Sequence, residues 1–143
     1  INTMYNSRVE EMMESTGMDF KNAIDTRQIR ADWNSNQARA QLQYSKPSMY
    51  VGRISRIVFN NGNADLFIGA GPASNVVATL SAYQAWPWVE HKGRWSIGGV
   101  IPNLQFAAKL NVGDKLYLHC RRVEFLGAIY LVNCLAFPNS IVR

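Results

Sequence analysis

The chain has 143 residues, of which 48% are hydrophobic and 17% charged, a composition that excludes a disordered or collagen-like protein and suits one globular domain. The longest apolar run, residues 128–132, is far shorter than the roughly 20 residues of a membrane-spanning helix, so no spanning segment is expected. The net charge of +5 lies wholly in residues 49–143, which suits a polyanion or an acidic protein surface as partner, or a mildly basic domain that binds neither.

The first 46 residues are predicted to form a helical leader that packs on the rest of the chain. Asn6 or Ser7 can cap a short helix that ends at Ser15, because Asn and Ser side chains accept hydrogen bonds from free N–H groups at a helix start. A second helical stretch is expected to begin near Asp19.

A stronger helix is predicted from Asp25 or Thr26 to Tyr44. Apolar residues recur along it at helical spacing, and Trp33 lies on this stripe, which is expected to dock on the core of the domain. The helix ends before Pro47, because the residue that precedes a proline is disfavoured in the helical conformation.

Residues 47–60 change to the period of a β-strand. The apolar positions change parity between Ile54 and Ile57, so one residue is inserted at Ser55 or Arg56. Such a phase shift predicts a β-bulge that bends one long strand into both halves of a small barrel. The side chains expected to face the barrel interior are Tyr50, Ile54, Ile57 and Phe59.

Four more strands are predicted over residues 64–68, 75–80, 115–124 and 129–137, with a short helix at residues 102–108 before the fourth strand of the series. The segment between Ala82 and Pro102, which contains Trp86, Trp88 and Trp95, is expected to be an irregular aromatic loop. This order predicts a mainly β fold, a five-stranded Greek-key OB-fold barrel over residues 47–143 preceded by the helical leader. A half-open β-sandwich is the alternative.

Four short segments, residues 29–40, 50–57, 109–120 and 130–134, carry a resemblance. They hold an Asn-bearing helix, a Gly in the first strand, a Leu-x-x-Gly-Asp-x-Leu turn and Cys residues on the last two strands. In these features the chain resembles the tRNA-anticodon-binding-like OB-fold family of small bacterial proteins. The resemblance covers residues 27–137 and implies the fold, but little about a ligand, since many members look like exported proteins of uncharacterised role.

Cys120 and Cys134 are expected on the last two strands, either as buried thiols or as a disulfide. A three-residue loop centred on Gly127 would place them directly opposite each other. A metal site with His91 and His119 is not expected, because His119 and Cys120 are neighbours on a strand and point to opposite faces. No cofactor and no set of acid, base and nucleophile is recognisable, so the protein is not expected to be an enzyme.

The first functional hypothesis is a non-catalytic module that binds single-stranded nucleic acid. Tyr117, His119 and Arg121 share one face of the fourth predicted strand, where bases can stack on rings while basic groups meet phosphates. Core packing is the alternative role of Trp86 and Trp88. The candidate contacts are Arg53, Trp86, Trp88, Lys92, Arg94, Trp95, Tyr117, His119 and Arg121.

The second hypothesis is an exported or envelope-associated accessory protein that binds another protein or a small ligand. A disulfide would favour a periplasmic or extracellular location, whereas nucleic-acid binding would favour the cytoplasm. The sequence starts at Ile1 without a secretion signal, so any export signal is expected upstream of this residue.

Overall fold

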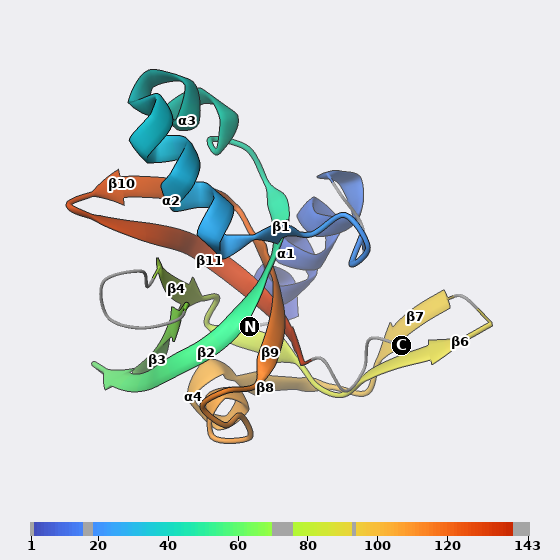
Figure 1. The fold of residues 1–143 in the computed structure, drawn as a ribbon. Coiled ribbons are helices and arrows are strands. Elements are labelled where there is room, and N and C mark those ends of the chain that lie inside the picture. The colour runs from blue at the N-terminus through green and yellow to red at the C-terminus, as the bar shows by residue number, and fades with distance from the viewer. Residues whose placement is uncertain (1, 16–18, 70–75, 93, 139–143) are drawn as a thin grey trace.

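The computed structural model describes residues 2–15, 19–69, 76–92 and 94–138, without the side chains of residues 2–6 and 90. Its centre is a closed barrel, and the mainly β fold predicted from the sequence is confirmed (Figure 1). Five strands form the barrel: β2 (Ser48–Asn60), β3 (Asn63–Ile68), β4 (Val76–Leu80), β9 (Lys115–Cys120) and β11 (Ala128–Pro138).

The barrel strands pair in the order β2, β3, β4, β11, β9 and back to β2. Within this circuit β4 and β11 are parallel and the other neighbours are antiparallel. This order is consistent with an OB-like barrel, and its closure excludes the half-open sandwich. The predicted first residue of the third barrel strand, position 75, lies outside the described residues.

Strand β2 bends at a β-bulge, as the change of parity predicts. Its pairing with β3 shifts register between Ile54 and Arg56. Ile54 is buried and Ile57 packs against the same core, so both parities face the interior. The interior position expected for Phe59 is wrong, because this residue lies at the barrel rim beside the turn that follows Asn60, and it is 67% exposed.

The predicted fourth strand is divided at Arg121 into β9 and β10 (Arg122–Leu126). Strand β11 pairs with β10 over its first half and with β9 over its second half. Cys120 and Cys134 are opposite each other where β11 changes partner, and their sulfur atoms are 2.12 Å apart. Of the two states left open by the sequence, the structure contains the disulfide, in the register that a loop centred on Gly127 allows.

Helices cover the two ends of the barrel (Figure 1). At one end lie α2 (Thr26–Ser35) and α3 (Gln37–Gln43), and at the other lies α4 (Asn103–Ala107). Ile29, Tyr44 and Phe106 are buried in the barrel core from these ends. The single helix predicted up to Tyr44 is interrupted at Asn36, which has an extended backbone and caps α3 by accepting a hydrogen bond from the Arg39 N–H.

The prediction of a helical stretch that begins near Asp19 is wrong. The Asp19 carboxylate accepts a hydrogen bond from the Asn22 backbone N–H at 3.3 Å, so the chain turns here. The next residues form β1 (Ile24–Asp25), which pairs in parallel with β2. Strand β1 therefore places the start of α2 beside β2.

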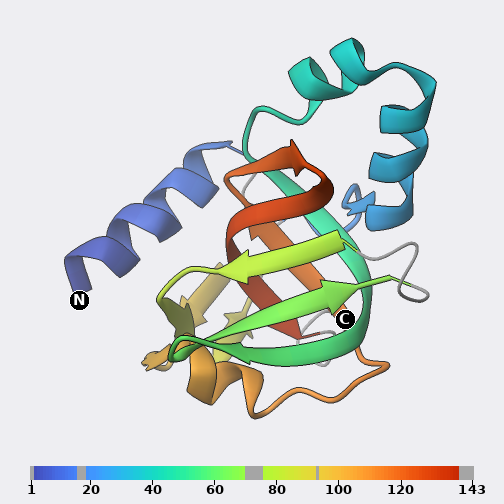
Figure 2. The ribbon, with the colours of Figure 1, turned by 90° about the vertical axis from the view of Figure 1, so that its left-hand side faces the viewer.

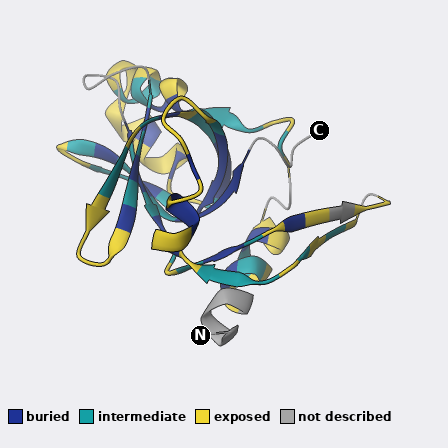
Figure 3. Cartoon of the chain, turned by 90° about the horizontal axis from the view of Figure 1, so that it is seen from below, coloured by how far each residue is buried: buried dark blue, intermediate teal, exposed yellow. Residues whose placement is uncertain are grey.

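The segment expected as an irregular loop is a two-stranded ribbon. Strand β5 (Tyr83–Ala85) pairs with β8 (Val100–Pro102), and β6 (Trp88–His91) pairs with β7 (Arg94–Ile97). Pro87 and the Gly98–Gly99 pair interrupt the alternating pattern of side chains that would have indicated strands in the sequence. In the structure they lie opposite each other, and the Gly98 N–H donates to the Pro87 carbonyl at 2.8 Å. Figures 1 and 3 show the ribbon extending away from the barrel.

A second apolar cluster lies outside the barrel, between its outer wall, the ribbon and α1 (Asn2–Ser15). Figure 2 shows α1 on a different side of the barrel from α2 and α3. No helix in the described ranges is long and apolar enough to cross a membrane. The buried members of this outer cluster are Met12, Met49, Ala85, Trp88, Tyr117, Leu135 and Phe137.

Reduction of the disulfide is expected to lower the free energy of unfolding by about 3 kcal/mol, because the bond closes a short loop in the unfolded chain. Urea unfolding with and without reductant measures this difference. The double variant Cys120→Ala, Cys134→Ala is the control, and reductant should leave it unchanged. Two reactive thiols in the unfolded, unreduced protein would contradict the bond.

Candidate anion-binding site

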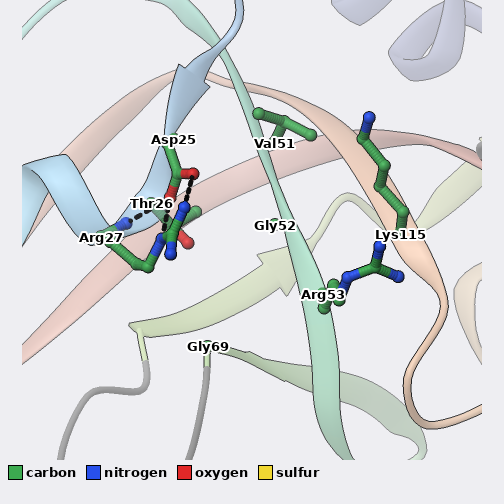
Figure 4. A pocket seen from close by; sticks show the side chains of 8 residues that line it. All are labelled: Asp25, Thr26, Arg27, Val51, Gly52, Arg53, Gly69 and Lys115. Atoms are coloured by element: carbon green, nitrogen blue, oxygen red, sulfur yellow. Dashed lines mark hydrogen bonds and ion pairs between the residues drawn. The ribbon is translucent and has the colours of Figure 1, made fainter.

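A pocket of about 350 Å³ opens where β1, the start of α2, β2 and the start of β9 meet (Figure 4). We call it the basic pocket. Three cationic side chains and one carboxylate line it, so its charge suits an anion. Its lining residues are Asp25, Thr26, Arg27, Val51, Gly52, Arg53, Gly69 and Lys115.

Arg53 and Lys115 form one wall of the basic pocket. They are directly opposite each other in the antiparallel pairing of β2 with β9. The Arg53 Nη1 donates to the Gly113 carbonyl at 3.1 Å, and the Lys115 Nζ lies 5.3 Å from the centre of the Tyr117 ring. Neither cation forms an ion pair with any described carboxylate. Like charges opposite each other destabilise a strand pair, so an anion between them would relieve this repulsion.

Asp25 and Arg27 form the facing wall. The Asp25 carboxylate caps α2 by accepting a hydrogen bond from the Arg27 backbone N–H at 2.9 Å. The Arg27 guanidinium donates to both oxygens of the same carboxylate, at 3.1 and 2.8 Å, and holds the pKa of Asp25 below its usual value. The charges of Asp25 and Arg27 cancel each other, so the positive charges of Arg53 and Lys115 remain available to a ligand.

Thr26 and Gly52 meet beside the pocket. Thr26 is 3% exposed, and the structure records no hydrogen bond between its hydroxyl and another described group. A Cβ atom at Gly52 would lie 2.8 Å from the Thr26 Oγ1 and 2.3 Å from the Ile68 Cγ2. The absence of a side chain at position 52 therefore allows the Thr26 hydroxyl to approach β2 closely.

The face predicted to stack bases is covered. Tyr117 and His119 share the outer face of β9 with Lys115, as their parity predicts. Their expected exposure is wrong, because Tyr117 is 8% exposed and His119 is fully buried. The Phe20 ring lies 5.2 Å from the Tyr117 ring, and α1 covers His119. Neither side chain is accessible to a ligand in this conformation.

A buried arginine of α1 holds His119. Arg8 is 4% exposed and donates to the Asn133 carbonyl at 2.9 Å and the His119 carbonyl at 2.6 Å. Its Nη1 lies 3.2 Å from the His119 Nδ1, so this ring nitrogen accepts and the Nε2 donates to the Ser15 Oγ at 3.0 Å. Burial, together with the charge of Arg8, lowers the pKa of His119 to about 4, and burial lowers the pKa of Arg8 to about 10.

Arg121 is exposed but engaged. Its guanidinium donates to both carboxylate oxygens of Glu11, with Nη2 to Oε2 at 2.9 Å and Nε to Oε1 at 3.1 Å. This interaction lowers the pKa of Glu11 below its usual value. Arg121 therefore fastens α1 to the end of β9 and is not free to meet a phosphate.

The ribbon separates the remaining predicted contacts into two groups. Trp88 packs on Phe137 with ring centres 4.9 Å apart, and Trp86 packs on Phe106 at 5.7 Å, so the packing alternative describes both residues. Trp95 is partly buried against Phe20. Lys92 and Arg94 are exposed at the tip of the ribbon, which extends away from the basic pocket (Figure 1).

Sequence reasoning found Arg53 but missed its partners in the basic pocket. Lys115 has the same parity as Tyr117 and could have been found from that signal. Arg27 and Thr26 could not, because no pattern predicts that β1 pairs with β2. No group of three His, Cys, Asp or Glu side chains within the described residues is arranged to hold a metal ion. No protein-family model matches the chain, and neither does any curated protein.

The close approach of Thr26 makes Gly52 sensitive to substitution. Gly52→Ala is expected to lower the free energy of unfolding by roughly 1 to 3 kcal/mol, because the new methyl group would overlap Ile68 and Thr26. Gly99→Ala is the matched control, since a Cβ there lies 3.6 Å from the nearest atom, at ordinary contact distance. Equal effects of the two variants in urea unfolding would contradict the packing described for the pocket.

Proposed function

We propose that the protein is a non-catalytic binding module whose barrel holds an anionic strand, single-stranded nucleic acid, at the basic pocket. The observation that carries the proposal is the pair Arg53 and Lys115, two cations opposite each other on a strand pair with no described carboxylate as partner. An anion placed between them would be attracted by both charges and would reduce the repulsion between the two cations.

Aromatic groups next to the pocket support a strand of bases as the ligand. The Lys115 ammonium contacts the Tyr117 ring, and the Phe20 ring links Tyr117 to Trp95. Phe20 and Trp95 are only partly buried, so they offer apolar surface near the cations. Modules that bind single strands combine basic groups for the backbone with aromatic surface for the bases. Membership of the tRNA-anticodon-binding-like OB-fold family is part of the same proposal, and the order of the barrel strands supports it.

The disulfide supports a second candidate, an exported accessory protein whose basic pocket meets an acidic protein surface. A bonded pair of cysteines is compatible with an oxidising compartment, in which disulfides persist. In a periplasmic or extracellular setting the same two cations would meet carboxylates of a partner. The two candidates share the pocket and differ in the polyanion that binds it.

The test is a fluorescence-anisotropy titration of labelled oligo(dT), oligo(U) and polyglutamate at salt concentrations from 50 to 200 mM. Nucleic-acid binding should weaken as salt rises, and Arg53→Ala should reduce the slope of log K against log salt by about 0.7, the value for one phosphate contact on a single strand. Lys115→Ala should act in the same way.

Arg39→Ala is the matched control. Arg39 is exposed on α3, so this substitution removes the same charge at a distance from the pocket. No salt-dependent binding of either nucleic acid at 50 mM salt, or an equal loss in Arg39→Ala and Arg53→Ala, would rule the first candidate out. Binding of polyglutamate alone would favour the accessory protein.

A further inference from the structure

The outer face that carries the basic pocket continues beneath α1. Side chains of β2 and β9 form successive rows on this face, because residues two apart on a strand point to the same side. The first row is open, the second is capped by Phe20, and the third lies under α1. The rows are Arg53 with Lys115, Val51 with Tyr117, and Met49 with His119.

Both apolar and polar side chains of residues 7–15 hold α1 on this face. Within residues 7–15 the apolar contacts come from Met12, which is fully buried, and from Val9, which packs on the outer cluster, while Met13 is 58% exposed. The polar contacts of the described side chains are the hydrogen bonds of Arg8 with His119 and the Asn133 carbonyl, that of Ser15 with His119, and the ion pair of Glu11 with Arg121. The polar part of this attachment depends on the charge states of Arg8, Glu11, His119 and Arg121.

Burial and the charge of Arg8 favour the neutral form of His119, and they outweigh the opposite effect of Glu11. From α1, Arg8 donates to its Nδ1 and Ser15 accepts from its Nε2. Glu11 is the one carboxylate of α1 that faces this region, and its charge is engaged by Arg121 at the end of β9. From β11 the Asn133 carbonyl contributes an acceptor that Arg8 already occupies. A proton added to the Nδ1 would remove the acceptor of Arg8 and place two buried cations in contact.

We propose that α1 is an acid-released cover: protonation of His119 detaches α1, which exposes His119 and frees Arg121 as an extension of the basic pocket. This proposal rests on the function proposed above. Detachment leaves Arg121 without Glu11 and adds the charge of His119 to the face. Lys115, His119 and Arg121 then follow one another along this face as two fixed cations and one imidazolium, with the Tyr117 ring between Lys115 and His119 beneath Phe20. Such a row of positive groups is suited to the backbone of a single strand.

The direction of the pH effect follows from linkage. Burial keeps the pKa of His119 at about 4 while α1 is docked, whereas an uncovered histidine has a value of about 6.5. The proton therefore favours the uncovered state, and docking weakens as the pH falls through this window. The equilibrium constant for release should rise about 30-fold between pH 7.5 and pH 5. The lowered pKa of Glu11 places the loss of its ion pair at lower pH than that of an ordinary glutamate.

Release is tested without a ligand by hydrogen exchange of the full chain, with rates corrected for the intrinsic effect of pH. Residues 7–15 should lose protection between pH 7.5 and pH 5 while the barrel strands keep theirs. His119→Asn should abolish this dependence, since the Asn amide still offers Arg8 an acceptor but does not titrate. His91→Asn is the matched control, because His91 is exposed on β6, and it should behave as the wild type.

If His119→Asn fails to fold, NMR of the wild type labelled with ¹⁵N-histidine decides. It should report a neutral His119 with its proton on Nε2 at pH 7.5, and a change of this signal together with the loss of α1 protection. Unchanged α1 protection at pH 5, or loss of protection in the barrel at the same pH, would overturn the proposal.

Binding of oligo(dT) at pH 7.5 and pH 5 separates this proposal from the proposed function, because thymine and phosphodiester groups do not titrate in this range. Tighter binding at pH 5 in wild type and His91→Asn, but not in His119→Asn, is the expected result. Release of α1 without any nucleic-acid binding would contradict the proposed function and the ligand part of this proposal, while the acid-released cover would stand. Binding that is equal at both pH values, with α1 docked, would overturn the cover alone.

Discussion

The structure depends on the place where β11 changes partner. Strand β11 pairs with β10 up to Val132 and with β9 from Leu135, and its pairing with β4 shifts register between Leu131 and Cys134. The regular hydrogen-bond ladder cannot continue through such a change. Asn133 marks the change with a positive φ of 54°. The disulfide holds β9 to β11 directly beside it. Because the barrel closes through β11 and β9, this junction decides whether the sheet is a barrel at all.

Side chains satisfy the backbone groups that the ladder leaves free at the junction. The Thr79 hydroxyl accepts from the Asn133 N–H at 3.1 Å and donates to the Leu131 carbonyl at 3.3 Å. Gln84 comes from the root of the ribbon, and Arg8 comes from α1. The ribbon and α1 lie outside the barrel, but each contributes one buried polar side chain to the junction at which the barrel closes. Both elements therefore help to complete the barrel.

Patterns that depend on one strand and its immediate neighbour could be predicted from the sequence. The change of parity between Ile54 and Ile57 located the bulge, and the hairpin centred on Gly127 located the register of Cys120 and Cys134. Contacts between distant segments could not be predicted. Arg8 has the sequence context of a solvated helix position, and only the tertiary structure brings it onto the outer face of β9 and β11, where it covers the face expected to be open.

The junction restricts which residue can occupy position 84 during evolution, because Gln84 makes two specific hydrogen bonds there. Its amide nitrogen donates to the Cys134 carbonyl at 3.0 Å, and its amide oxygen accepts from the Ala136 N–H at 2.9 Å. Only a side chain that donates at one atom and accepts at another meets both demands: glutamate lacks the donor, and methionine has no donor and only a weak acceptor. Asparagine has the chemistry but is one methylene too short to reach from β5. In relatives of this protein that keep the junction, position 84 should hold glutamine while its exposed neighbours on the ribbon diverge.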